Sequence, residues 1–230
     1  MLRSHSLMFG LSTVLGAVLG QTGAVAATHV LTYNVEHPAY GIIGTYTNII
    51  SENRDAAEVR TDLHVAVRVI GIPLFHQDAR RQERWQGQRL VAFQSSTDDN
   101  GTRIEVSGQA VGDHFVIRST SNGTLTAPAQ VHPSNPWSPF LLQSGTLMST
   151  KTGRLNPVVV KDTGDVNVTL DGRPRRLRQW FIDGEKHQVV WIDGRGVIAA
   201  FQTQENGQTI NFVLKSDTAE DEATARLPEP

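Results

Sequence analysis

Cysteine is absent from the 230-residue sequence. Its absence excludes disulfide bonds, thiol nucleophiles, thiolate metal sites and lipid attachment at a cysteine. The chain must therefore be stabilised by its hydrophobic core, and 39% of its residues are apolar, which is enough to build one at this length.

The sequence also lacks a large excess of either charge. It carries 21 lysines and arginines against 23 aspartates and glutamates, a formal net charge of −2. Binding to nucleic acid depends on clustered positive charge that neutralises phosphates. We therefore expect no nucleic-acid partner.

One basic cluster stands out against this balance, and it consists of Arg173, Arg175, Arg176 and Arg178. In a strand, Arg176 and Arg178 would lie on the same face. We interpret the cluster as a surface for an anionic partner, such as an acidic protein of the cell envelope or lipid headgroups. The alternative is a solvated sheet surface with no partner.

Long apolar runs are scarce. The run near the N-terminus, Leu7–Leu19, follows Arg3 and precedes small-residue cleavage sites that end at Ala26 and Ala27. This order is typical of a secretory signal peptide, and the run is too short to cross a bilayer comfortably. We expect residues 1–27 to be removed on export, which leaves a periplasmic protein without a stable membrane anchor.

Turn signals are abundant in the last third of the chain, where Asp-Gly or Asn-Gly pairs separate short apolar runs rich in Val, Ile, Phe and Trp. Such pairs accept the positive φ of tight hairpins, so the pattern predicts an antiparallel meander. The runs are Val166–Leu170, Leu177–Ile182, Val189–Ile192, Val197–Phe201 and Thr209–Leu214, with turns at Gly172, Gly184, Gly194 and Gly207.

The first half of the chain carries similar patterns. Residues 29–120 predict roughly six or seven strands, with a bulge or tight bend at Gly44 and a hairpin at Asp98–Gly101. The segment Phe75–Arg84 is polar and compatible with a helix. The segment Glu58–Ile72 alternates as one strand.

The middle of the chain changes in character. Asn122–Asn135 is rich in Gly, Pro, Ser and Thr and predicts a loop, and Trp137–Leu142 predicts a short helix or an apolar plug that starts at Ser138-Pro139. Pro157–Lys161 predicts a strand, and Asp162–Asp165 predicts a turn.

Together these signals predict an all-β domain, residues 28–215, of about eleven strands. The expected architecture is a curved antiparallel meander sheet, or half-barrel, with one or two short helices. Residues 216–230 are acidic and poor in large apolar side chains, so we expect a disordered tail.

No catalytic motif is present. The sequence contains no Gly-x-Ser-x-Gly elbow and no paired-histidine metal motif, so we predict no catalytic residue, no metal and no cofactor. Glu83 would form a carboxylate pair with Asp98 or Asp99 only if the fold joined them. A hydrolase-type enzyme whose site is assembled through space is therefore the third of three functional hypotheses.

Large apolar side chains support the first hypothesis, which is binding of a lipid or other apolar small molecule inside the curved sheet. The competing interpretation is ordinary core packing. The second hypothesis is a structural or interaction module of the cell envelope with a solid core. The residues expected to line a ligand site are Trp85, Trp137, Phe140, Leu141, Trp180 and Trp191.

Several short motifs occur together across residues 29–215. They are Tyr33-x-Val35 with Gly41-x-x-Gly44, Glu83-x-Trp85-x-Gly87-x-x-Leu90 with Thr97-Asp98-x-Asn100-Gly101, Asn135-Pro136-Trp137, and Val190-Trp191-Ile192-Asp193-x-x-Gly196. With them the chain resembles a family of exported, β-rich bacterial proteins of unknown function, although Ile192 stands where that family usually has Tyr. That family is distantly similar to lipoprotein-carrier (LolA/LolB-like) half-barrels. The resemblance implies a curved sheet over an apolar cavity closed by short helices, and it implies no catalytic residues.

Overall fold

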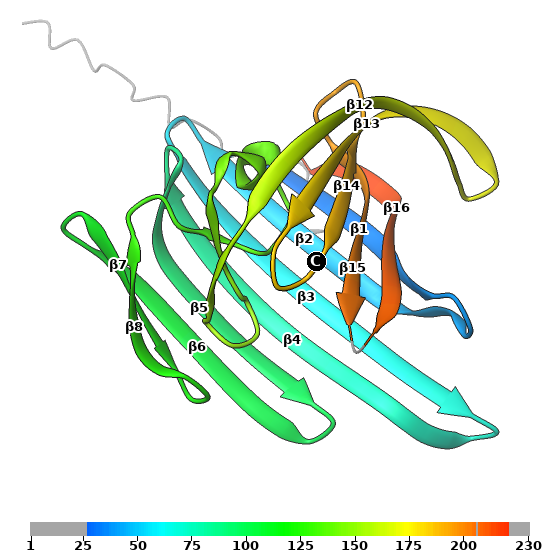
Figure 1. The fold of residues 1–230 in the computed structure, drawn as a ribbon, viewed down its shortest axis with the longest axis horizontal. Helices are drawn as coiled ribbons and strands as arrows, with labels where there is room; N and C mark the ends of the chain where they lie inside the picture. The colour runs from blue at the N-terminus through cyan, green and yellow to red at the C-terminus, as the bar shows by residue number, and fades with distance from the viewer. Residues whose placement is uncertain (1–26, 206, 221–230) are drawn as a thin grey trace, which may run out of the picture.

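The computed structural model describes residues 27–205 and 207–220 (Figure 1). Apart from Ala27, the predicted signal peptide lies outside the described residues. The described residues form a 13-stranded antiparallel sheet, a 3-stranded sheet and a short 3-10 helix. The predicted all-β class and the curved, open sheet are confirmed.

The large sheet takes its strands from both halves of the chain. They are β1 (Ala27–His37), β2 (Gly41–Asn53), β3 (Ala56–Val69), β4 (Ile72–Gln86), β5 (Arg89–Asp99), β6 (Thr102–Val111), β7 (His114–Ser119), β8 (Gly123–Pro128), β12 (Val159–Leu170), β13 (Arg173–Asp183), β14 (Gln188–Ile192), β15 (Ile198–Glu205) and β16 (Gln208–Glu220).

The strand order is β12-β13-β14-β15-β16-β1-β2-β3-β4-β5-β6-β7-β8. The first and last strands therefore pair with each other in the middle of the sheet, and β8 and β12 form its two edges. Because those edges do not pair, the sheet is not closed into a barrel. The two halves of the chain form one continuous sheet rather than two packed ones.

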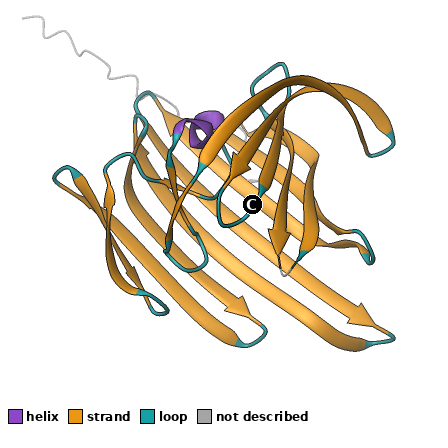
Figure 2. Cartoon of the chain, in the orientation of Figure 1, coloured by secondary structure: helices purple, strands orange, loops and turns teal. Residues whose placement is uncertain are grey.

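The chain passes from one edge to the other through β9 (His132–Pro133), η1 (Pro139–Gln143), β10 (Thr146–Met148) and β11 (Leu155–Pro157). We call residues 129–158 the connection. It lies over the sheet, with η1 drawn in purple in Figure 2. Leu141, Leu147 and Met148 from the connection are buried in the same hydrophobic core as the inward side chains of the sheet. At Trp137–Leu142, where a short helix or an apolar plug was expected, the structure has a short 3-10 helix, which spans Pro139–Gln143 and begins after the capping residue Ser138.

Two of the predicted reversals show the expected backbone. Asn100-Gly101 and Asp171-Gly172 both have positive φ at both positions, with values of 51° and 85° and of 49° and 72°. Two successive residues with positive φ define the turn whose twist matches that of paired strands. The bulge predicted near Gly44 is present as a register shift between Val35 and Glu36 in the pairing of β1 with β2.

The segment Phe75–Arg84, predicted to be compatible with a helix, belongs to strand β4. Arg81 and Glu83 lie at inward positions of this strand. In a half-buried strand the inward positions are usually apolar, and they alternate with polar outward positions. The alternation was therefore hidden in the sequence, although the structure buries that face.

Four other boundaries differ from prediction. Part of the expected loop at Asn122–Asn135 is strand β8, the edge strand. The turn expected at Asp162–Asp165 is a bulge within β12, and the strand expected at Glu58–Ile72 ends at Val69 because Ile70 and Gly71 form the turn to β4. Strand β16 continues to Glu220 by pairing with β1, beyond the domain end expected at residue 215. Residues 221–230 of the expected tail lie outside the described part of the chain.

Candidate functional site

A cavity of about 570 Å³ lies between the sheet and the connection. Apolar side chains from β1, β2, β3, β4, β15 and β16 form most of its sheet wall. These side chains are Val35, Ile43, Leu63, Val65, Val67, Phe75, Phe201 and Phe212. The volume lies within the range of about 300–1,000 Å³ that is usual for sites of small molecules.

The register of β3 and β4 shows how the cavity is oriented. Val65 pairs with Gln77 and Val67 pairs with Phe75, and directly paired residues share a face of the sheet. Further along the same face, Thr61 pairs with Arg81. The wall therefore runs along the strands from Arg81 to Phe75, a length of about 20 Å at about 3.3 Å per residue.

The connection supplies the opposite wall through Asn135, Pro136, Leu147 and Val158. Asn135 is buried, and its side chain is held by side chains of the sheet. The cavity therefore depends on how the connection is attached to the sheet.

The attachment is a buried carboxylate, Glu83 on β4, which is 0% exposed. Glu83 Oε2 accepts hydrogen bonds from the indole Nε1 atoms of Trp85 and Trp137, both at 2.9 Å, and Oε1 accepts from Asn135 Nδ2 at 2.8 Å. Three N–H donors therefore satisfy this carboxylate, as a buried charge requires. Two of the donors, Asn135 and Trp137, belong to the connection.

Asn135 extends this polar network across the neighbouring strands. Its Nδ2 also donates to Thr61 Oγ1 at 2.9 Å, and its Oδ1 accepts from the hydroxyl of Tyr46. The hydroxyl of Thr61 donates in turn to Asn48 Oδ1 at 2.8 Å. The network links β2, β3 and β4 to the connection at the Arg81 end of the cavity.

Burial controls the ionisation of this network. Loss of hydration raises the pKa of Glu83 to about 6, although hydrogen bonds from Asn135, Trp85 and Trp137 and the charge of Arg81 act in the opposite direction. Loss of hydration also lowers the pKa of Arg81, while Tyr46 and Glu83 favour its charged form. An arginine in a protein stays protonated nonetheless, so Arg81 brings a positive charge to the cavity.

Two of the six residues predicted to bind a ligand meet in this network. The rings of Trp85 and Trp137 are 5.8 Å apart, and both donate to Glu83. The other four are separate: Leu141 is buried in the core, Phe140 is 39% exposed, and Trp180 and Trp191 lie on β13 and β14. The side chains that line the cavity belong to other residues.

The four predicted arginines of β13 do not form one surface. Arg173 and Arg175 pair with Leu170 and Val168, whereas Arg176 pairs with Asn167, so alternation places them on opposite faces of the strand. Arg176 and Arg178 share a face, as predicted. Each of these two forms an ion pair with an aspartate of β12, Asp165 and Asp162 respectively.

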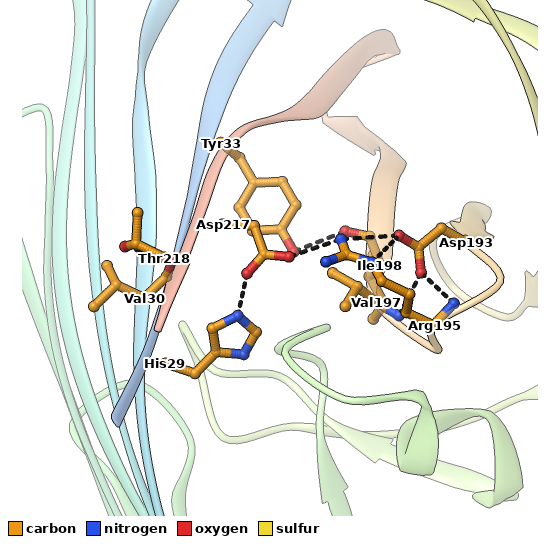
Figure 3. Close-up of polar contacts among 9 residues, drawn as sticks. All are labelled: His29, Val30, Tyr33, Asp193, Arg195, Val197, Ile198, Asp217 and Thr218. Atoms are coloured by element: carbon orange, nitrogen blue, oxygen red, sulfur yellow. Dashed lines mark hydrogen bonds and ion pairs between the residues drawn. The ribbon is translucent and has the colours of Figure 1, made fainter. Parts of the chain in front are cut away.

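A second polar cluster joins the start of β1, the end of β16 and the β14–β15 turn (Figure 3). Asp217 accepts from His29 through Oδ1 and from Arg195 through Oδ2, the latter at 2.8 Å. Arg195 also contacts Asp193, whose Oδ1 accepts from the backbone N–H of Val197 at 3.0 Å. The cluster therefore helps to hold β1 and β16 together where these two strands pair.

Among the described features, this cluster gives the most support to the enzyme hypothesis, because a carboxylate hydrogen-bonded to a histidine can orient that histidine as a general base. Both oxygens of Asp217 are already engaged, however, and the residues of the cluster line neither the cavity nor the groove described next. Within residues 27–205 and 207–220, no group of three or more His, Asp or Glu side chains is placed to hold a metal ion. We interpret the cluster as structural.

A groove of about 730 Å³ is lined by residues of β3 to β8, mostly from the face opposite the cavity. Charged and hydroxyl side chains such as Arg60, Asp62, Arg80, Glu105 and Arg118 dominate it, and most of them are exposed. The groove is larger than the cavity, but among its lining residues Val106 is the one aliphatic side chain, whereas small-molecule sites are lined mainly by hydrophobic and aromatic side chains.

The fold and the cavity define an all-β protein in which an open curved sheet covers a largely apolar hollow. The chain belongs to the family DUF6134, described as a domain of unknown function, whose model matches residues 41–215. No curated protein matches the sequence. A family of β-rich proteins of unknown function is what the sequence motifs predicted.

Among solved structures, the chain is similar to a β-barrel-like protein of the domain of unknown function DUF1849 from Brucella abortus. The TM-score is 0.61, the sequence identity is 11%, and the match covers 85% of this chain and 98% of the other. At this identity the likeness shows the fold alone. Within the described residues, no helix has the length and apolar character needed to cross a bilayer.

Proposed function

We propose that this chain is a non-enzymatic binding protein that holds a lipid or another apolar small molecule in the cavity beneath its curved sheet. The observation that carries the proposal is the hollow of about 570 Å³ with a largely apolar sheet wall. A purely structural module would be expected to fill this space, because protein interiors are close-packed. The resemblance to lipoprotein-carrier half-barrels points in the same direction.

Native mass spectrometry of the protein purified from its own host tests this proposal. The expected result is an additional mass that disappears after organic extraction. The matched variants are Val65→Trp, which places an indole in the cavity, and His64→Trp, which places one on the opposite face of the same strand. Loss of the additional mass in Val65→Trp alone supports the proposal, and its absence from the wild-type protein contradicts it.

The proposed location is the periplasm, after cleavage near Ala26 or Ala27, and it is supported by the order of charged, apolar and small residues at the N-terminus. Fractionation of the native host with N-terminal sequencing of the protein tests it. A cytosolic protein that retains residues 1–27 would contradict export while leaving the binding proposal intact.

A second candidate function is an interaction module of the cell envelope. Strand β13 pairs with β14 only over Arg178–Ile182, so residues 166–177 of β12 and β13 form a two-stranded ribbon that extends beyond the sheet (Figure 1). This ribbon carries three of the four predicted arginines, and all three are exposed. Charge reversal at Arg173 and Arg175 should remove pull-down partners if the ribbon binds an acidic protein, and unchanged partners would contradict this function.

A further inference from the structure

Among the described residues, Arg81 is the one arginine at an inward position of the sheet wall of the cavity. It sits two residues from the buried Ala79 and two residues from the buried Glu83, on the same face of β4. Placing a guanidinium in such a position costs free energy unless its charge and its N–H groups find partners. The partners of Arg81 therefore indicate what this position is for.

The protein satisfies Arg81 only in part. A guanidinium carries five N–H donors. Tyr46 lies near enough to favour the charged form of Arg81, but the buried Nε atom of Arg81 has no hydrogen-bond partner among the described residues. Glu83 is near enough to influence its charge, yet the oxygens of Glu83 are occupied by N–H groups of Trp85, Trp137 and Asn135.

Arg81 also reaches the cavity, since it is one of the lining residues and is only half-buried. From Arg81 the sheet wall continues through Leu63, Val65 and Val67 on β3 to Phe75 on β4. A site with a cation at one end and about 20 Å of largely apolar wall beyond it matches a molecule with an anionic head and an apolar tail.

The other charged residues that line the cavity also favour an anionic ligand. Lys151, Arg154 and Lys186 add positive charge, whereas Glu185 is the lining carboxylate. Lys151 pairs with Asp99, outside the lining, and Arg154 pairs with Glu185 at 3.4 Å. A cavity with this balance attracts anions and disfavours cationic amphiphiles.

We propose that the ligand is an anionic amphiphile whose carboxylate or phosphate is bound by Arg81, with its tail along Leu63, Val65, Val67 and Phe75. This assignment rests on the proposed function, because it names the chemical class of molecule that the same cavity holds. The guanidinium suits either head group, since its planar fork donates two parallel hydrogen bonds to a carboxylate or to a phosphate.

Calorimetric titration with palmitate and with hexadecan-1-ol tests the assignment, because the two probes share a tail and differ in the head. Wild-type protein should bind palmitate roughly 10- to 100-fold more tightly than hexadecan-1-ol. The variant Arg81→Met should lose this preference. The control Arg80→Met, on the opposite face of β4 and 90% exposed at its side chain, should retain it.

Other probes separate the sources of the anion. Hexadecyl phosphate should bind as palmitate does, whereas acetate and inorganic phosphate should not displace palmitate. Displacement by either small anion would show a site for a free anion and overturn the assignment of an amphiphilic ligand. Equal binding of palmitate and hexadecan-1-ol by the wild-type protein would overturn the role of Arg81 but leave the proposed function standing. Binding of neither would overturn both.

A folding defect in Arg81→Met is recognised by loss of hexadecan-1-ol binding as well. In that event Arg81→Lys, which keeps the charge without the planar fork, is the second variant. A reduced preference for palmitate in Arg81→Lys supports the assignment, and an unchanged preference overturns it.

Discussion

Trp137 donates a hydrogen bond from its indole Nε1 to Glu83 Oε2 at 2.9 Å, across 54 positions of the sequence. Through this contact the connection is fixed to β4 near the end of that strand, and Trp85 donates to the same oxygen from the sheet. The connection, which forms the wall of the cavity opposite the sheet, is therefore held by a buried carboxylate as well as by apolar packing.

At pH 5, replacing Glu83 with Gln should lower the free energy of unfolding by about 1–3 kcal/mol, because an amide N–H₂ would face one of the N–H donors that now find an oxygen. Urea unfolding followed by tryptophan fluorescence measures the change. Glu58→Gln is the control, since Glu58 is a more exposed carboxylate on β3, and it should change stability by less than about 0.5 kcal/mol. Equal losses in the two variants would refute the role assigned to Glu83.

Stability should also depend on pH through Glu83. Burial raises the pKa of its carboxyl to about 6, from an ordinary value of 4.5. The folded protein therefore binds this proton more tightly than the unfolded chain, so the contribution of Glu83 is largest below pH 4.5 and is lost as the pH rises through 6. The stability difference between wild type and Glu83→Gln should shrink by about 2 kcal/mol between pH 4.5 and 7. A difference that stays constant or grows over this range would be inconsistent with the raised pKa.

The opposite pH dependence of stability is expected from Asp217. Partial burial acts to raise the pKa of this carboxyl, but hydrogen bonds and charge from His29 and Arg195 outweigh it and hold the pKa below its usual value. Its contribution is therefore present above the unfolded pKa and is lost as the pH falls. Asp217→Asn should cost about 1 kcal/mol at pH 7 and less below pH 4. Asp165→Asn, in an exposed pair with Arg176, is the control and should cost less at pH 7.

Gly44 should not tolerate a side chain. A Cβ atom at this position would lie 2.0 Å from the backbone oxygen of His64 on β3, whereas one at Gly145 would meet nothing within 4 Å. Gly44→Ala should therefore destabilise the protein by about 1–3 kcal/mol or more, and Gly145→Ala should have little effect. Thermal unfolding of the two variants measures the contrast, and similar melting temperatures would argue against close approach of β2 and β3.

Much of the fold could be predicted from the sequence because hairpin turns are local. Asn100-Gly101 and Asp171-Gly172 identify their own reversals, and alternating apolar residues identify most of the strands between them. Strand β4 was missed for the same local reason, since Arg81 and Glu83 replace apolar residues on its buried face. Strand β8 was missed because its Gly, Thr and Pro content is typical of a loop.

The candidate site could be predicted less well because it is assembled from distant segments. Glu83 and Trp85 belong to one of the motifs used for the family resemblance, and Asn135 and Trp137 belong to another. No spacing in the sequence indicates that these motifs meet, or that Arg81 reaches the cavity between them. The signal available in the sequence is the pair Glu83 and Trp85, a charged residue two positions before an aromatic one within a β-rich region.

The most direct measurement is a fluorescence titration of the wild-type protein, Val65→Trp and His64→Trp with N-phenyl-1-naphthylamine, a neutral apolar dye. Saturable binding to the wild type and to His64→Trp, with at least about tenfold weaker binding to Val65→Trp, is the result that a hollow interior predicts. Equal binding by all three proteins, or none by the wild type, would contradict a ligand site beneath the sheet.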